Sequence, residues 1–240
     1  MSELFSIQLQ NQQQQGRDGV WLDLPTTTEQ VQAALRQIGI SSDNPQGLFI
    51  SGYFAEEEKR FAIPYNMVLA SNVDELNFLA SRLETLSTGE RAELNAALQA
   101  PQSELSSIGK ITDFPENVDY YVHLPDVHGP AQLGDYYLNR SGMVDMPEEW
   151  KGGIDTAQFG RYVAQQEQGA FTQYGYLVKS GDEWQKVHEG QPVPEEYRVL
   201  SFPVPEVLRD AANIPPPMQS EPQPQKVLPI ILNGKDSAER

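Results

Sequence analysis

Acidic residues outnumber basic residues two to one in this 240-residue chain, and the excess is spread over almost its whole length. The segments 1–69, 70–119 and 120–203 carry net charges of −4, −6 and −6, whereas residues 204–240 carry only −1. A lone acidic tail would be typical of a disordered arm. An excess spread over the folding segments instead predicts a folded body with a continuous negative field, which repels nucleic acid and attracts proteins that bind it.

The apolar fraction of 39% is low for one thick core, and it favours several small modules with modest cores. Because net charge also serves solubility, an ordinary acidic protein stays open as an alternative. The absence of cysteine excludes disulfides and thiol nucleophiles. The chain has no apolar run of about 20 residues and no signal-peptide pattern, so we expect a cytoplasmic protein that does not bind membranes.

Residues 1–70 have the pattern of a small antiparallel sheet with one helix. Thr26 and Glu29 have the spacing of a capping box, which predicts the start of the helix, and Gly39 is expected to end it. Strands are expected on both sides of this helix, at residues 5–9, 20–24 and 47–54.

Residues 71–112 have the pattern of a small helical module. Asn72 is expected to cap a first helix, Thr88 to start a second and Pro101 to end that second helix. A short third helix is expected to follow Pro101.

Residues 113–203 predict a mixed α+β module. Pro130, Pro147 and Asp155 stand where three helices are expected to begin, and Tyr162 is assigned to the buried side of the last one. Strands are expected at residues 171–179 and 184–188, joined as a hairpin across residues 180–182, and residues 197–202 are compatible with a third.

Residues 204–240 form a Pro- and Gln-rich tail that is expected to be flexible. It contains one apolar patch, Val227–Leu232, for which disorder and a docking role both stay open. The complete prediction is an α+β, elongated chain of three small modules followed by this tail.

The chain lacks the Gly-rich phosphate loops and the nucleophile elbow of common enzyme families. His123, Asp126 and His128 are the only clustered residues of metal-ligand type, and a metal-dependent hydrolase that uses them is one alternative. Their spacing is not that of a helical ligand pair, so we expect no metal, no cofactor and no enzyme. Basic residues do not cluster, which argues against direct binding of nucleic acid.

Four stretches occur in an order and spacing that resembles the ArdA-type antirestriction proteins, over about residues 4–180. They are GRDGVWLDLPTTTEQVQAAL (16–35), VDELNFLASRLETL (73–86), VHGPAQLGDYYLNR (127–140) and FGRYVAQQEQGAFTQYGYLV (159–178). The resemblance implies an elongated homodimer, joined through its third module, that imitates bent B-form DNA. Such a protein occupies the DNA groove of type I restriction–modification enzymes, at the methyltransferase core, and protects incoming mobile DNA.

This chain departs from the pattern of the family in having fewer acids, especially at residues 160–166, and in its extension past about residue 200. Another reading is an acidic adaptor of a mobile element that docks through the tail. The resemblance assigns the DNA-mimic surface to acidic residues, each of which has a merely solvated carboxylate as its alternative. The expected surface comprises Glu56, Glu57, Glu58, Glu84, Glu90, Glu93, Asp113, Glu116, Asp119, Asp126, Asp135, Asp145, Glu148, Glu149 and Asp155.

Overall fold

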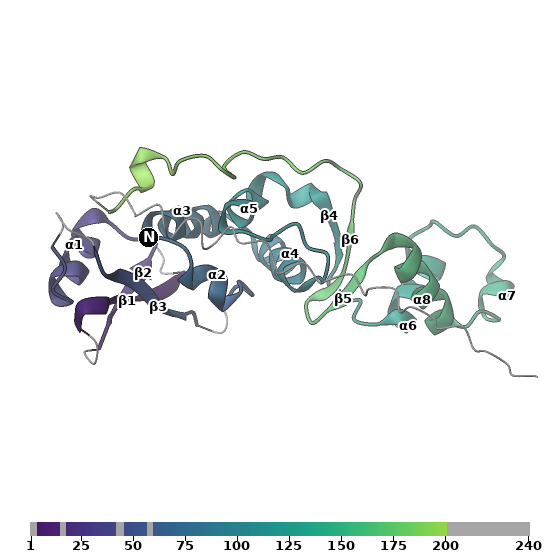
Figure 1. The fold of residues 1–240 in the computed structure, drawn as a ribbon. Coiled ribbons are helices and arrows are strands. Elements are labelled where there is room, and N and C mark those ends of the chain that lie inside the picture. Colours follow the sequence, from purple (N-terminus) through teal and green to yellow (C-terminus); the bar gives the residue numbers. More distant parts are fainter. Residues whose placement is uncertain (1–3, 15–17, 42–45, 57–59, 201–240) are drawn as a thin grey trace, which may run out of the picture.

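The computed structural model describes residues 4–14, 18–41, 46–56 and 60–200 of an elongated molecule (Figure 1). A small sheet lies at one end, helices occupy the middle, and a second sheet leads to a helical unit at the far end. Helices combined with small antiparallel sheets confirm the predicted α+β class. Over the described residues, no helix has both the length and the apolar character needed to cross a bilayer.

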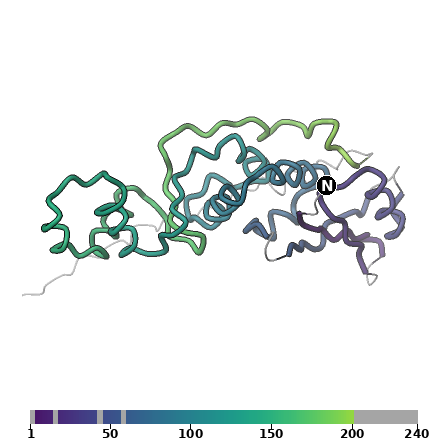
Figure 2. Tube along the Cα trace, turned by 180° about the vertical axis from the view of Figure 1, so that it is seen from behind, coloured from purple at the N-terminus to yellow at the C-terminus, as the bar shows by residue number. Residues whose placement is uncertain are grey.

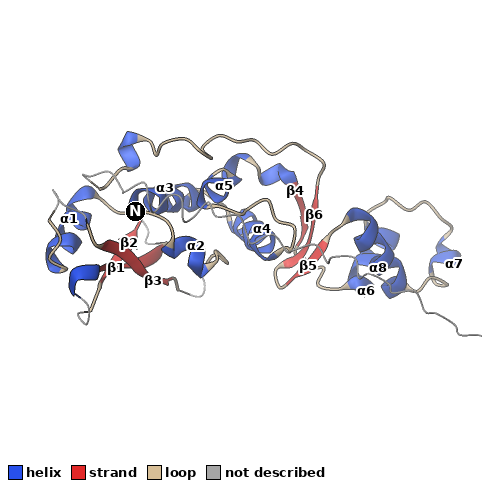
Figure 3. Ribbon diagram, viewed as in Figure 1, coloured by secondary structure: helices blue, strands red, loops and turns tan. Residues whose placement is uncertain are grey.

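The N-terminal sheet has the antiparallel strand order β2-β1-β3, and α1 packs on it (Figure 3). Phe5, Ile7 and Leu9 alternate along the central strand and are at most 1% exposed, because their face of the sheet meets the helix. The elements are β1 (Phe5–Asn11), the 3-10 turn η1 (Gln12–Gln14), β2 (Val20–Leu24), α1 (Thr28–Gln37) and β3 (Leu48–Phe54). They confirm the three predicted strands and the helix.

Helix α1 begins one residue later than its capping pattern predicted. Thr27 is the N-cap, and Gln30 completes the capping box in place of the pair Thr26 and Glu29. Thr26 is buried, and its backbone N–H donates to Asn77 Oδ1 at 2.7 Å. A contact with a distant helix therefore holds Thr26 outside α1.

The middle of the chain is helical, as predicted, with α3 (Val73–Glu84), α4 (Thr88–Gln99) and α5 (Ile108–Thr112). One further helix, α2 (Tyr65–Leu69), was not predicted and falls within residues 1–70, for which a single helix was expected. Asn72 caps α3 by accepting the Glu75 N–H at 2.9 Å, and α4 begins at Thr88 behind a Ser87 cap, before it ends just short of Pro101. The expected helix boundaries are thus confirmed here.

Beyond residue 113, short helices alternate with a second antiparallel sheet of strand order β4-β6-β5. The starts predicted at Pro130, Pro147 and Asp155 are those of α6, α7 and α8. The elements are the 3-10 turns η3 (Phe114–Glu116) and η4 (Val118–Tyr120), β4 (Tyr121–Leu124), α6 (Pro130–Asp135), the π-helical turn η5 (Tyr136–Arg140), α7 (Glu148–Lys151), α8 (Thr156–Glu167), β5 (Ala170–Thr172), β6 (Gly175–Lys179) and the 3-10 turn η6 (Glu195–Tyr197).

The predicted hairpin between residues 171–179 and 184–188 is wrong. The stretch 171–179 itself folds back as β5 and β6, because Gly175 adopts φ +120° directly after the turn. Strand β6 then pairs with β4, and residues 184–188 form no strand. Within residues 197–200 no strand forms either, and residues 201–240, which include Val227–Leu232, lie outside the described residues.

The buried apolar side chains form two clusters. The larger one runs without a break from Leu4 across residues 70 and 112 to Tyr121, and it also includes Leu177 and Leu200. The smaller one comprises Val127, Leu133 and Tyr176, with half-buried neighbours from α8 and β5. The larger core thus spans two of the predicted module boundaries. The division of the chain into three modules stays a prediction.

Candidate functional site

The acidic residues assigned to the expected surface occur along the whole length of the molecule, from the N-terminal sheet to α7. Glu57 and Glu58 lie outside the described residues. The others are Glu56 after β3, Glu84 at the end of α3, Glu90 and Glu93 in α4, Asp113 after α5, Glu116 and Asp119 in η3 and η4, Asp126 and Asp135 before and within α6, Asp145 before α7, Glu148 and Glu149 in α7, and Asp155 at the N-cap of α8.

Asp113 does not belong to this surface. It is fully buried, and its two carboxylate oxygens accept the backbone N–H groups of His188 at 2.6 Å and Glu189 at 3.2 Å. A buried carboxylate is stable only with such partners. The prediction for Asp113 is therefore wrong, since a segment 75 residues away covers it.

Glu93 is half-buried and carries less charge than the sequence suggests. Burial raises its pKa to about 8, and the nearby charges of Glu90 and Asp119 add to the rise. At neutral pH this carboxyl group is therefore mostly protonated, and it contributes little to a negative surface.

Three of the predicted carboxylates form ion pairs within the molecule. Glu116 pairs with Arg82. Asp135 lies 3.2 Å from a nitrogen of Arg140, and Glu148 lies 2.9 Å from Lys151 Nζ. Each pair offsets one negative charge locally, so these side chains have less charge to offer a partner.

Two other predicted carboxylates cap helices. Glu90 accepts the Ser87 N–H at 2.7 Å, and the bonds from the Ser87 side chain and backbone hold its pKa below the ordinary value. Asp155 accepts the Ala157 and Gln158 N–H groups at the start of α8. Both carboxylates lie at the N-terminus of a helix, which favours an anion.

Asp119, Asp126, Asp145 and Glu149 are exposed, and no cation among the described residues pairs with them. They lie in η4, in the β4–α6 connection, before α7 and within α7. These four are the predicted residues best placed to meet a cationic partner.

Four further exposed carboxylates, which the predicted surface does not include, form two adjacent pairs in the sequence. Asp182-Glu183 and Glu195-Glu196 lie between β6 and residue 200. Their only sequence signal is adjacency, which does not distinguish a functional pair from a solvated one.

The alternative metal site at His123, Asp126 and His128 has no support in the geometry. His123 Nε2 lies 2.7 Å from the carbonyl oxygen of Tyr174, a contact between β4 and the β5–β6 turn. Over residues 4–14, 18–41, 46–56 and 60–200, no three His, Cys, Asp or Glu side chains gather as a metal site would require.

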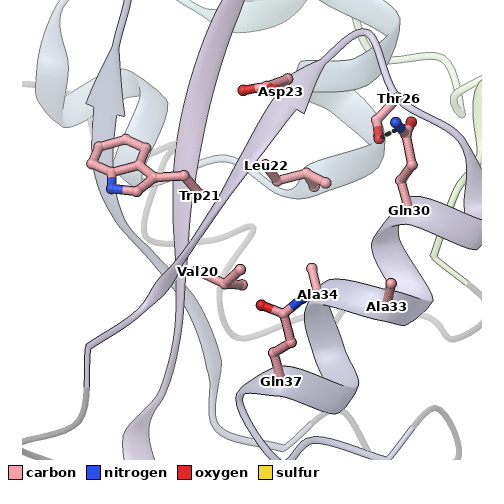
Figure 4. A pocket seen from close by; sticks show the side chains of 9 residues that line it. All are labelled: Val20, Trp21, Leu22, Asp23, Thr26, Gln30, Ala33, Ala34 and Gln37. Atoms are coloured by element: carbon pink, nitrogen blue, oxygen red, sulfur yellow. Dashed lines mark hydrogen bonds between the residues drawn. The ribbon is translucent and has the colours of Figure 1, made fainter.

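A shallow pocket of about 210 Å³ lies between β2 and α1 (Figure 4). Its lining includes Trp21 and Asp23 from the strand and Ala33 and Gln37 from the helix. Asp23, the one charged residue among the described residues of the lining, accepts the Ser6 hydroxyl hydrogen at 2.9 Å. The pocket is smaller than typical small-molecule sites and lacks converging polar groups, so it does not indicate a substrate.

A comparison with protein-family models matches residues 15–178 to the model described as "Antirestriction protein (ArdA)". No curated protein matches the chain. Proteins of the matched family are inhibitors and not enzymes. The match covers well over half of the sequence and includes all four of the stretches that carry the resemblance. The chain therefore belongs to the ArdA family of antirestriction proteins.

Proposed function

We propose that this protein inhibits type I restriction–modification enzymes by presenting its acidic surface in place of DNA. One observation carries the proposal: exposed carboxylates that pair with no cation of the described residues recur from the middle of the elongated body to its far end, at Asp119, Asp126, Asp145 and Glu149. A cationic groove built for DNA would meet negative charge over a long stretch. Membership of the antirestriction family supports the same reading.

Charge alone does not reproduce DNA. A dimer would carry twice the net charge of −17, which at about 1.7 Å of duplex per charge matches only about 58 Å of DNA. Internal ion pairs, such as the one between Asp135 and Arg140, reduce the useful fraction further. Placement of the charges on a stiff body must therefore supply part of the affinity, because a groove whose cations are already in position binds a rigid anion more tightly.

The proposal includes a homodimer formed through the third module. This part of the molecule presents large apolar side chains to solvent: Met143 is 76% exposed, Trp150 65% and Tyr162 60%. Exposed aromatic and methionine side chains are enriched at interfaces. Association here would bury apolar surface and leave the carboxylates of the middle segment free.

The decisive experiment compares two double variants that remove the same charge. The test variant carries Asp119→Asn and Asp126→Asn, and the control carries Asp18→Asn and Glu29→Gln on the N-terminal unit. We expect the test variant to bind a type I methyltransferase core about tenfold more weakly, with a shallower dependence of affinity on salt, and the control to stay near wild type.

In a restricting host, the test variant should also protect unmodified phage DNA less well than the control variant does. Equal affinities for the two variants, or binding of the wild-type protein that does not change between low and high salt, would contradict the proposal.

A further inference from the structure

Residues 180–200, here called the strap, follow β6 and lie beyond the end of the family match at residue 178. The strap leaves the second sheet, crosses α5 and α3, and returns to the N-terminal unit, as both views show (Figures 1 and 2). Its only regular element is the short turn η6. A connection of this length without regular structure is usually mobile or functional. The contacts that hold the strap in place therefore bear on its role.

The strap contacts the body in reverse sequence order. At its start, the backbone N–H of Ser180 donates to the Tyr120 carbonyl at 2.9 Å. Further along, the Gln185 N–H donates to Asn117 Oδ1 at 2.7 Å, and Asn117 Nδ2 donates back to the Gln185 carbonyl at 2.9 Å. Asn117, 4% exposed, thus binds the strap backbone with both ends of its amide, as a neighbouring β-strand would.

The next anchor is Asp113, whose buried carboxylate accepts the N–H groups of His188 and Glu189. Beside it, the strap lies close against α5, because a Cβ placed on Gly109 would be 3.2 Å from the Glu189 Cα. The glycine therefore permits the close approach of two backbones.

The far end of the strap is fixed to α3. Phe78 contacts the rings of His188 and Tyr197, with centroid distances of 5.0 and 4.7 Å. Asp74 Oδ1 accepts the N–H groups of Val199 and Leu200, both at 2.8 Å, and these two side chains belong to the larger core.

Asn77 joins three parts of the molecule at one point. From α3, its Oδ1 accepts the Thr26 N–H of the N-terminal unit at 2.7 Å, and its Nδ2 donates to the Tyr197 carbonyl of the strap at 2.9 Å. The side chain is only 3% exposed. Loss of the strap would leave a buried amide donor unpaired, which is unfavourable.

We propose that the strap is a brace that fixes the N-terminal unit and the middle helices to the second sheet. Four polar side chains, Asp74, Asn77, Asp113 and Asn117, bind its backbone and make its path specific. The brace holds constant the separation between the N-terminal unit and the second sheet. Its importance for inhibition rests on the proposed function, since loss of the brace would weaken binding only to a partner that recognises a long, rigid anion.

The first test uses Asp113→Ala in the full chain, with Asp18→Ala as the control that removes an exposed carboxylate. We expect the backbone amides of His188 and Glu189 to exchange hydrogen about tenfold faster or more in Asp113→Ala, and trypsin to cut faster after Lys186. Far-UV circular dichroism should stay near wild type.

A gentler pair keeps the test valid if Asp113→Ala fails to fold. Gly109→Ala and Gly89→Ala both change the second residue of a helix, but a Cβ at Gly89 meets nothing within 4 Å, whereas one at Gly109 presses on the strap. We expect faster trypsin cleavage only in Gly109→Ala. Wild-type exchange and cleavage in both Asp113→Ala and Gly109→Ala would overturn the brace.

The link to inhibition is tested separately. Because the chain has no cysteine, spin labels can be placed at Arg36→Cys in α1 and Gln173→Cys between β5 and β6. A distance distribution that broadens in Asp113→Ala supports the brace, and an unchanged one overturns it. Broadening together with weaker binding to the methyltransferase core supports both proposals. If wild-type protein shows no binding at all, the proposed function fails while the brace stands.

Discussion

The two ends of this molecule are held together in different ways. The main body, residues 4–124 with the strap, has a continuous core of Leu, Ile, Val and Phe side chains. The distal unit, residues 125–169, contributes Val127 and Leu133 to a small cluster completed by Tyr176 of β6. Its helices α7 and α8 bury almost nothing, since Gly160 is their single buried residue.

Close backbone contact replaces apolar burial in the distal unit. Helices α6 and α8 cross at Gly134 and Gly160, where an added Cβ would lie 1.9 Å from the Thr156 carbonyl oxygen and 1.8 Å from that of Pro130, respectively. At the end of α8, the Glu167 carboxylate accepts the hydroxyl hydrogens of Tyr137 and Tyr176. The comparison shows that a unit with little core is specified by glycines and a few polar contacts, which makes it sensitive to single changes.

The largest effect is expected in the main body. Leu79→Ala removes a fully buried side chain of α3 and should lower the free energy of unfolding by about 2–5 kcal/mol, measured by urea titration. Gln99→Ala, at an exposed position of α4, should change it little. If Leu79→Ala shifts the unfolding of the distal unit by the same amount, the two regions form one cooperative unit and the comparison fails.

Gly160→Ala should destabilise the distal unit by roughly 1–3 kcal/mol, because the new methyl group would overlap the Pro130 carbonyl. Hydrogen exchange should quicken in α6 and α8 while amides of α3 keep their protection. Gly152→Ala, where a Cβ meets nothing within 4 Å, is the matched control. A loss of amide protection that is uniform along the chain would contradict the separate stabilisation of the distal unit and the main body.

Glu167→Gln should lower the stability of the distal unit by about 1 kcal/mol, since the charge-assisted bonds from Tyr137 and Tyr176 become neutral ones. Hydrogen exchange of the α8 amides measures this change. Protection of α8 as in wild type would show that the carboxylate does not clamp the helix to the sheet.

The smallest effect concerns the pH dependence of the main body. Burial raises the pKa of Glu93 from 4.5 to about 8, so the folded state retains a proton that the unfolded state releases, and stability falls as pH rises from about 4.5 to about 8. Glu93→Gln should remove this loss, which solvent screening limits to the order of 1 kcal/mol. Urea titrations at pH 5 and pH 8 measure it, with Glu149→Gln as the control; equal pH slopes in wild type and Glu93→Gln would contradict the assignment.

Sequence reasoning succeeded where the signal is local. Phe5, Ile7 and Leu9 alternate with polar residues because one face of their strand is buried. Asn72 and Asp155 cap the N-termini of their helices by accepting N–H groups within three residues. It failed on α8, where Tyr162 was assigned inward but is 60% exposed. The helix turns about 100° per residue, so Tyr162 points away from the face that Gly160 packs against α6.

The sequence by itself determined the acidic character, most helix and strand positions, and the family. The tertiary structure decided which carboxylates reach solvent. Asp113 was indistinguishable from Asp119 in the sequence, yet one is buried under the strap and the other is exposed. The physical reason is range: caps and periodicity act over a few residues, whereas burial of Asp113 depends on backbone donors 75 residues away, whose approach only the packed molecule defines.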